Sequence, residues 1–444
     1  MQFEYLPLSA LRCRSGNART HSAKQVRKIA KSIEAFGFNN PLLVDDKYVV
    51  IAGHGRLDAA KLLKLATVPV MRLSHMSEEQ IRAYVLADNR LALEAGWDKE
   101  TLSIELQGLV ELDFDVQLTG FETAEIDILL GDAEEVSGTG LTAEDSLPEP
   151  TGRPAITRPG DLWILGKHRL YCGDAREASS YDAVLNGEKA DFIFTDPPFN
   201  VKIANNVSGL GRVQHDEFPM ASGEMTRQQF TGFLTTVFGR LAENSRDGSI
   251  HEICIDWRHL REMLDAGHSV YSELKNICIW NKTNAGMGSL FRSQHEMIFI
   301  WKNGTEPHVN NVELGKYGRS RSNIWTYAGA NTFRRGRLDE LAMHPTAKPV
   351  ALVADAIKDC SPRGGIVLDP FCGSGSILIA AGSTGRKARA LELDCGYVDT
   401  AVRRWQNYTG KFAVLAESGQ TFETTEECRA KAANDNVKTE SSAA

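Results

Sequence analysis

The chain has 444 residues, 42% of them hydrophobic, and a formal net charge of −8, so we expect two or three globular domains with sizeable cores. No run of about 18 apolar residues predicts a membrane span, and the N-terminus lacks the pattern of a secretory signal. The eight cysteines have no metal-site spacing, so we predict no metal and a reduced, cytoplasmic protein.

The net charge does not exclude a nucleic-acid partner, because the charge is unevenly distributed along the chain. Residues 88–149 contain 17 acidic and 2 basic residues, whereas the first 87 residues contain 13 basic and 7 acidic ones. A second basic stretch has no acidic residue and includes Lys316, Arg319, Arg321, Arg334, Arg335 and Arg337. Such a stretch is either a solvated surface or a contact for DNA phosphates.

Residues 1–90 have the pattern of a small α/β domain. Apolar residues at helical spacing predict a helix over 23–36, which Gly37 ends. A second helix is expected over about 56–65. Short apolar runs predict strands at 41–44, 48–51 and 68–71.

The rest of the chain divides by composition. Residues 91–133 are helical and acidic, 134–159 have the composition of a linker, and the polar tail over 419–444 is expected to be disordered. Between 160 and 415, strand-like runs alternate with helical segments, which predicts a mostly parallel sheet with helices on both faces. The predicted strands are 191–194, 250–255, 277–280, 297–301, 365–368 and 388–391.

A glycine turn follows the strand over 365–368. That strand leads into Asp369, and the turn after it contains Gly373 and Gly375 before a helix begins. Glycines allow a ligand to approach the backbone at the carboxyl end of a strand. Glu392 lies about 20 residues later, at the tip of the next strand, where an acid can bind ribose hydroxyls. The full dinucleotide spacing is missing, so we predict a pocket for a nucleoside cofactor.

A second loop follows the strand over 191–194 and reads Thr-Asp-Pro-Pro-Phe-Asn from residue 195. The Asp196 carboxylate and the Pro197 carbonyl can accept both hydrogens of an exocyclic amino group, and Phe199 offers a face on which a base can stack. A base inside a duplex cannot reach such a loop and has to be flipped out. The alternative is a structural Pro-Pro turn.

These motifs and their order resemble the β class of DNA amino-methyltransferases. The resemblance covers about 160–412 and includes three further segments: 168–174, which ends in Gly-Asp, the middle motifs from Trp280 to Glu296, and the His-Pro-Thr-Ala-Lys-Pro motif from His344. It implies a Rossmann-like methyltransferase sheet, S-adenosylmethionine as the cofactor and double-stranded DNA as the partner. Relatives of this class are often dimers, so a homodimer is an option.

The resemblance also assigns residues to roles. The residues expected to hold the target base are Asp196, Pro197, Pro198 and Phe199. The residues expected to bind the cofactor are Asp174, Thr346, Lys348, Asp369, Phe371, Gly373, Gly375 and Glu392. Target recognition is expected over about 303–343, which contains the second basic stretch.

The base that receives the methyl group is open at this stage. Asp196 favours adenine N6, since cytosine-N4 enzymes of this kind more often carry Ser at this position. Relatives that act on RNA or on protein glutamine usually carry Asn there, so these substrates are disfavoured. A partner nuclease, as in a restriction-modification pair, is also open. The remaining alternative is a DNA-binding adaptor whose methyltransferase half is inactive.

The N-terminal region resembles the ParB-like domains that bind nucleotide and DNA. The matching segments are 17–20, 30–43, 53–56 and 88–90. The family's Gly-Glu-Arg-Arg box is Gly-His-Gly-Arg here, so only Arg56 of its polar residues is retained. This mismatch disfavours nucleotide binding, which stays one option, and added DNA affinity or assembly is the other.

Overall fold

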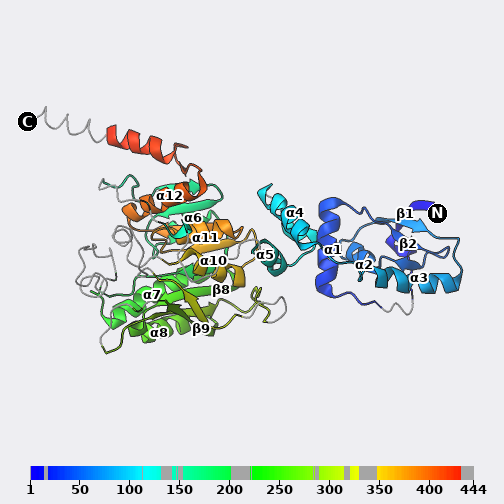
Figure 1. The fold of residues 1–444 in the computed structure, drawn as a ribbon, viewed down its shortest axis with the longest axis horizontal. Helices are drawn as coiled ribbons and strands as arrows, with labels where there is room; N and C mark the ends of the chain where they lie inside the picture. Colours follow the sequence, from blue (N-terminus) through cyan, green and yellow to red (C-terminus); the bar gives the residue numbers. More distant parts are fainter. Residues whose placement is uncertain are drawn as a thin grey trace, which may run out of the picture. The chain divides into compact units, whose positions relative to one another are not determined.

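The computed structural model describes residues 2–14, 19–112, 114–131, 143–146, 148, 154–201, 221, 223–283, 285, 290–314, 321–329 and 348–431. The chain forms two compact units, residues 1–134 and 135–444 (Figure 1). Among the helices of the described residues, none is long and apolar enough to cross a membrane.

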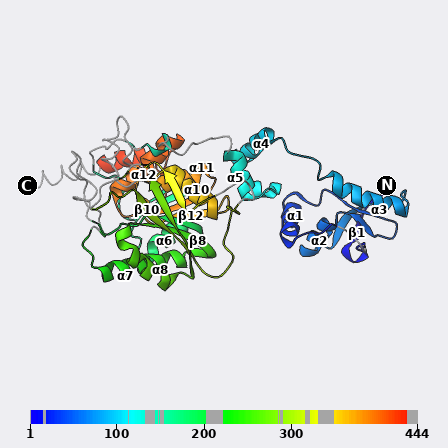
Figure 2. The same cartoon turned by 60° about the horizontal axis from the view of Figure 1, so that its bottom comes forward.

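The N-terminal unit contains a four-stranded sheet in the order β1-β4-β2-β3, with α1 and α2 packed together (Figure 2). Its first helix covers Ala23–Phe36 as predicted: Ser22 caps it by accepting a hydrogen bond from Gln25 N, and Gly37 follows with φ +84°. Strand β1 is an addition to the predicted set and pairs antiparallel with β4. The elements of this sheet region are β1 (Gln2–Pro7), η1 (Leu8–Ala10), α1 (Ala23–Phe36), β2 (Leu42–Val44), β3 (Val50–Ala52), α2 (His54–Leu62), β4 (Thr67–Arg72) and α3 (Glu78–Leu91).

The acidic segment of this unit is helical, as its pattern predicts. It contains α4 (Lys99–Glu111), η2 (Val116–Thr119) and α5 (Thr123–Gly131). Asp98 caps α4 by accepting hydrogen bonds from the backbone N–H groups of Glu100 and Thr101. Leu106, Val116 and Ile126 form a small buried cluster, so these helices have a core of their own.

The second unit is built on a ten-stranded sheet in the order β11-β9-β10-β8-β7-β12-β13-β6-β5-β14. The five central strands, from β8 to β6, run parallel, while β10 and β9 on one side and β5 and β14 on the other are added antiparallel. Its strands are β5 (Leu162–Leu165), β6 (His168–Cys172), β7 (Ala190–Thr195), β8 (Ser245–Ile255), β9 (Glu273–Lys282), β10 (His295–Lys302), β11 (Ile324–Tyr327), β12 (Ile366–Asp369), β13 (Lys387–Glu392) and β14 (Val414–Leu415).

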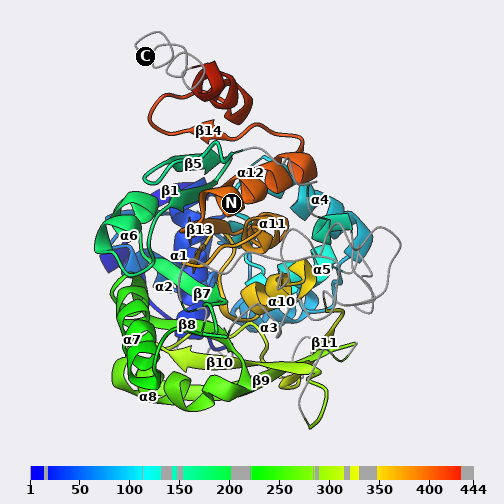
Figure 3. The ribbon, with the colours of Figure 1, turned by 90° about the vertical axis from the view of Figure 1, so that its left-hand side faces the viewer.

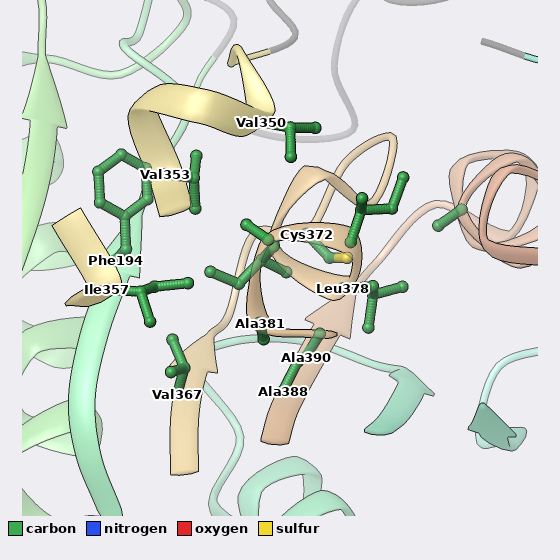
Figure 4. Close-up of a cluster of buried hydrophobic side chains, with 14 of the residues drawn as sticks. Phe194, Val350, Val353, Ile357, Val367, Cys372, Leu378, Ala381, Ala388 and Ala390 are labelled. Carbon is green, nitrogen blue, oxygen red and sulfur yellow. The ribbon is translucent and has the colours of Figure 1, made fainter. Parts of the chain in front are cut away.

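Helices cover both faces of this sheet (Figure 3). One core lies under α10, α11 and α12 and contains Phe194, Val367 and Ala390 from the central strands (Figure 4). The other core lies under α6, α7 and α8 and contains Ile193 and Leu368. The helical elements are η3 (Ala143–Asp145), α6 (Ala178–Leu185), α7 (Arg227–Glu243), η4 (Trp257–His259), α8 (Leu260–Val270), α10 (Val350–Cys360), α11 (Ser376–Ser383) and α12 (Cys395–Thr409). The structure therefore confirms the predicted doubly covered, mostly parallel sheet.

The predicted disordered tail is wrong over its first part, since residues 422–431 are helical. Phe422 is fully buried and its ring lies 5.1 Å from that of Trp163. Arg429 forms an ion pair with Asp161 of the sheet region. One aromatic anchor and one ion pair thus fix a segment whose polar composition suggested disorder.

Described parts of the predicted linker also pack onto this unit. The backbone N–H groups of Ile156 and Thr157 donate to the two carboxylate oxygens of Asp399, at 2.6 and 3.0 Å, and both residues are buried. Asp145 accepts a hydrogen bond from Val350 N at the start of α10. Composition alone could not reveal these partners, which lie more than 200 residues away in sequence.

Candidate active site

The two predicted loops meet at one edge of the sheet because β7 and β12 are parallel neighbours. Strand β7 ends at Thr195, just before the Asp-Pro-Pro loop, and β12 ends at Asp369, just before the glycine turn. The Thr195 hydroxyl donates to Asp369 Oδ1 at 2.8 Å, which ties the loops together. Ligands of α/β proteins bind at this carboxyl edge of the strands.

Asp196 is positioned by its loop and by one lysine. Its Oδ2 forms an ion pair with Lys348 Nζ. Its Oδ1 is buried, and within the described part of the chain it has no hydrogen-bond partner. Asn200 anchors the end of the loop by accepting from Gly223 N and Met225 N, both at 3.1 Å. The loop therefore presents one unused acceptor oxygen.

Phe199 and Lys348 lie beside each other, with Lys348 Nζ 5.6 Å from the ring centroid of Phe199. Phe199 is half-buried, so part of its ring remains accessible for stacking. The sequence placed Lys348 at the methionine end of the cofactor. In the structure its ammonium contacts Asp196, and its backbone carbonyl accepts from Ser376 Oγ at the start of α11, so its role at the cofactor stays a prediction.

Two charged residues complete the surroundings of Asp196 and were absent from the predicted site. Glu296 Oε2 lies 3.0 Å from Lys348 Nζ, and Lys282 Nζ lies 2.5 Å from Glu296 Oε1. Both residues belong to the middle motifs, which marked a resemblance but gave no role. Only the antiparallel pairing of β9 with β10 brings them to the same edge as Asp196.

Burial and neighbouring charges move the carboxylates of this cluster apart. Burial and the charge of Glu296 raise the pKa of Asp196 to about 6, although Lys348 and Lys282 oppose the rise. Burial also acts to raise the pKa of Glu296, but Lys348 and Lys282 outweigh it and lower that pKa to about 2. Asp196 is therefore the carboxylate of this cluster with the greater proton affinity.

The glycine turn packs closely against the sheet and the last long helix. Gly375 has φ +85°, and a Cβ there would lie 2.9 Å from the Cβ of Ala401 on α12. Gly373 N donates to Glu392 Oε2 at 2.7 Å, and Phe371 N donates to Asp369 Oδ1 at 3.0 Å. The turn thus requires glycine and is bonded to the predicted ribose acid.

The next two strand ends bring the remaining cofactor candidates together. Strands β13 and β6 are parallel, with Glu392 opposite Cys172, and Gly173 N donates to the Glu392 carbonyl at 2.9 Å. Burial raises the pKa of Glu392 to about 7. Asp174 pairs with Arg176, which outweighs burial and lowers the pKa of Asp174. Acceptor oxygens at these two strand ends suit the hydroxyl and amino donors of a nucleoside.

The predicted DNA-binding set is only partly visible. Arg321 lies in an ion-pair cluster with Asp359 at 2.9 Å and Asp355 at 3.4 Å, and its guanidinium stacks over Trp325. Two acids of α10 thus neutralise its charge, which disfavours a phosphate contact, and its role in DNA binding stays a prediction. The remaining predicted DNA-binding residues lie outside the described part of the chain: Lys316, Arg319, Arg334, Arg335 and Arg337. Thr346, predicted to bind the cofactor, also lies outside it.

The N-terminal unit uses its matched arginines internally. Arg56 Nη1 donates to the carbonyls of Asn40 and Pro41 at 2.6 and 3.3 Å. Arg19 donates to the side chain of Asn89 at 3.0 Å. These bonds hold the segments that resemble the ParB-like family together as a scaffold, and a nucleotide at this unit stays a prediction.

Together, the parallel sheet, the glycine turn, the acid at the next strand tip and the adjacent Asp-Pro-Pro loop define a Rossmann-like methyltransferase. Family comparisons agree: a DNA methylase model matches residues 190–403. Models of the ParB N-terminal domain and of the ParB-methyltransferase HTH domain match 2–89 and 100–159. The chain therefore contains a DNA methylase domain of the N6/N4 family together with a ParB N-terminal domain, and its methyl donor is S-adenosylmethionine.

Two curated relatives each match a part of the chain. The ParB-like nuclease domain-containing protein YnaK of Escherichia coli K12 is 48% identical over 80 residues, covering 18% of this chain and 92% of YnaK. The DNA adenine methyltransferase YhdJ of the same organism is 25% identical over 256 residues, covering 50% of this chain and 77% of YhdJ. The solved M1.HpyAVI-SAM complex is 19% identical, with a TM-score of 0.38, over 53% of this chain and 97% of that one. The HTH match spans most of the segments predicted as extension and linker.

Proposed function

We propose that this DNA methyltransferase acts on the N6 amino group of adenine in duplex DNA, after the base has flipped out of the helix. The observation that carries the proposal is the buried Oδ1 of Asp196, which has no hydrogen-bond partner among the described residues. It lies at the strand edge next to the glycine turn, so an amino group held there would face the cofactor pocket. YhdJ, whose match covers 50% of this chain, is named as an adenine methyltransferase.

The chain's own residues would orient the amino group rather than react covalently with it. Asp196 Oδ1 and the Pro197 carbonyl accept its two hydrogens, which turns the nitrogen lone pair toward the methyl donor. Phe199 stacks on the base, a contact that contributes about 1–3 kcal/mol in single-stranded nucleic-acid sites. S-adenosylmethionine supplies an activated methyl group when bound. Orientation of this kind can account for much of the rate of a group transfer.

The cofactor candidates fit this proposal by the chemistry of their donors and acceptors. Glu392 is held by the N–H groups of Gly373 and Asp394, which orient its carboxylate without filling all its lone pairs. Phe371 is half-buried beside the turn and offers an apolar face. Asp174 at the neighbouring strand end is the proposed contact for the adenine of the cofactor.

Cytosine N4 is the competing target, because the family includes both chemistries. Purified protein would be incubated with labelled S-adenosylmethionine and mixed-sequence duplex DNA, followed by digestion to nucleosides and mass spectrometry. We expect N6-methyladenine, and Asp196→Ala should lose it while exposed Asp182→Ala keeps it. N4-methylcytosine would refute the base assignment, and unmethylated DNA with wild type would favour the adaptor alternative.

Two further proposals concern the contacts with DNA. We propose that the basic residues of 303–343 outside the described part contact the recognition sequence, and that the ParB and HTH domains add affinity for DNA. Filter binding at several salt concentrations would test this for Arg334→Ala and Arg335→Ala, whose salt slopes should fall. Unchanged slopes would remove these residues from the interface. A homodimer stays a prediction.

A further inference from the structure

Two carboxylates share one buried ammonium beside the target-base loop, and within the described part of the chain only Glu296 has a second cation. Lys348 Nζ contacts Asp196 Oδ2 and lies 3.0 Å from Glu296 Oε2. Lys282 Nζ lies 2.5 Å from Glu296 Oε1, and among the described residues Lys282 pairs with Glu296 alone. The four charges sum to zero, but their arrangement around Asp196 is asymmetric.

We propose that Glu296 is a positioning residue that shares Lys348 with Asp196 and so keeps Asp196 a strong hydrogen-bond and proton acceptor for the target amino group. This proposal rests on the proposed function, since it concerns the same reaction. A lysine paired with Asp196 alone would neutralise most of its charge in a site screened from water. Glu296 draws on the same ammonium, and Lys282 keeps Glu296 ionised.

The fold holds this cluster in one geometry. Glu296 on β10 lies opposite Trp280 on β9, and Lys282 follows two residues later on the same face of the strand. The Trp280 ring lies under both ammonium groups, 4.7 Å from Lys282 Nζ and 5.7 Å from Lys348 Nζ. Because cations are attracted to the face of an indole, the ring stabilises both lysines between the carboxylates.

The arrangement gives Asp196 a role after the methyl group has moved. The amino nitrogen uses its lone pair to form the new N–C bond while the C–S bond electrons leave with sulfur, so the nitrogen becomes cationic and must lose one proton. Asp196 Oδ1 is the acceptor that faces it, and the carboxyl then releases the proton to solvent. Besides the cluster lysines and Glu296, Asp369 and Cys254 also interact electrostatically with Asp196.

The test measures the pH dependence of the single-turnover methyl-transfer rate in two variants with opposite charge effects. Glu296→Gln removes a negative neighbour of Asp196 and so lowers the pKa of Asp196. The acidic limb of the pH–rate profile should therefore move down by about one pH unit, and the plateau rate should fall about tenfold. Lys282→Met removes a positive charge, so the acidic limb should move up by about one unit.

The double variant and a surface pair serve as controls. Losing one member of a buried ion pair can destabilise the fold, whereas the double variant Glu296→Gln/Lys282→Met removes both charges. Its acidic limb should lie between those of the single variants. The exposed Lys275–Glu273 pair is on the same strand as Lys282, and Lys275→Met should match wild type.

The outcomes separate this proposal from the proposed function. Equal rate losses at every pH, with no displacement of the acidic limb, would overturn the role of Glu296 and leave a purely structural cluster. A wild-type protein that transfers no methyl group to DNA at any pH would instead refute the proposed function. Recovery of the rate and the limb by Glu296→Asp would support charge sharing.

Discussion

Replacing Asp369 by Asn is expected to remove a large part of the pH dependence of stability of the ligand-free protein. Asp369 is buried and accepts hydrogen bonds from Thr195 Oγ1 and Phe371 N. Burial raises the pKa of Asp369 to about 7; the two hydrogen bonds oppose this rise, and the carboxylates of Asp196 and Glu392 add to it. Asn would keep an acceptor oxygen and lose the ionisation.

The size and sign follow from the difference between folded and unfolded states. The ordinary pKa is 3.8, so the difference is about three units, or about 4 kcal/mol at about 1.4 kcal/mol per unit. Between these values the folded state holds a proton that the unfolded state has lost, so stability falls as pH rises. The stabilisation is complete below pH 3.8 and is lost once the pH passes about 7. The free energy of unfolding of Asp369→Asn should therefore exceed that of wild type at pH 8 by up to about 4 kcal/mol.

Urea unfolding at pH 4, 6 and 8 would measure this difference, with constant m-values as the check that both proteins unfold in the same way. The two proteins should have similar free energies of unfolding at pH 4 and diverge toward pH 8. Asp182→Asn, on the exposed surface of α6, should follow wild type throughout. Parallel curves for wild type and Asp369→Asn would refute the assignment of a buried, protonated acid.

Three further substitutions test other parts of the structure. Phe422→Ala should lower the free energy of unfolding by about 3–5 kcal/mol. Phe412 is 67% exposed, so Phe412→Ala should change that free energy little in the same urea titration. Gly375→Ala should lower the free energy of unfolding by about 1–2 kcal/mol because of its left-handed backbone. The close contact with Ala401 of α12 should also weaken cofactor binding measured by calorimetry. Gly410 has φ +69° and lies in open space, so Gly410→Ala should carry only the backbone cost. Arg321→Met should destabilise the protein, because breaking a buried ion pair costs up to about 3–5 kcal/mol, yet leave the salt slope of DNA binding unchanged; a reduced slope would restore Arg321 to the interface.

The arrangement of the proposed cofactor residues could be predicted because its signals are local in sequence. Strand, glycine turn and acid follow one another from residue 366 to Glu392, and parallel pairing places the strand ends together without further information. The charge cluster could not be predicted in this way. Asp196 and Lys348 are 152 residues apart, and nothing in either segment indicates that Lys348 pairs with Asp196 or that Glu296 shares it.

The basic stretch also shows that charge pairing cannot be predicted from the sequence. A run of positive charges indicates attraction to phosphate only if the charges are unpaired, and pairing is a property of the folded chain. Arg321 belongs to the predicted DNA-binding stretch, but Asp355 and Asp359 on α10 bind its guanidinium. The prediction of a disordered tail fails for a related reason, since a single buried Phe422 outweighs the polar composition of the segment.

The sheet itself divides the chemistry into two halves. The parallel strands β12, β13 and β6 carry Asp369, Glu392 and the Gly173–Asp174 segment, which face the proposed cofactor side. The antiparallel strands β9 and β10, added beyond β8, carry Lys282 and Glu296, which act on Asp196. Strand β7 joins the halves through Thr195. Substitutions on the parallel side should therefore change cofactor affinity first, and those on the antiparallel side should change the rate of transfer to a bound base.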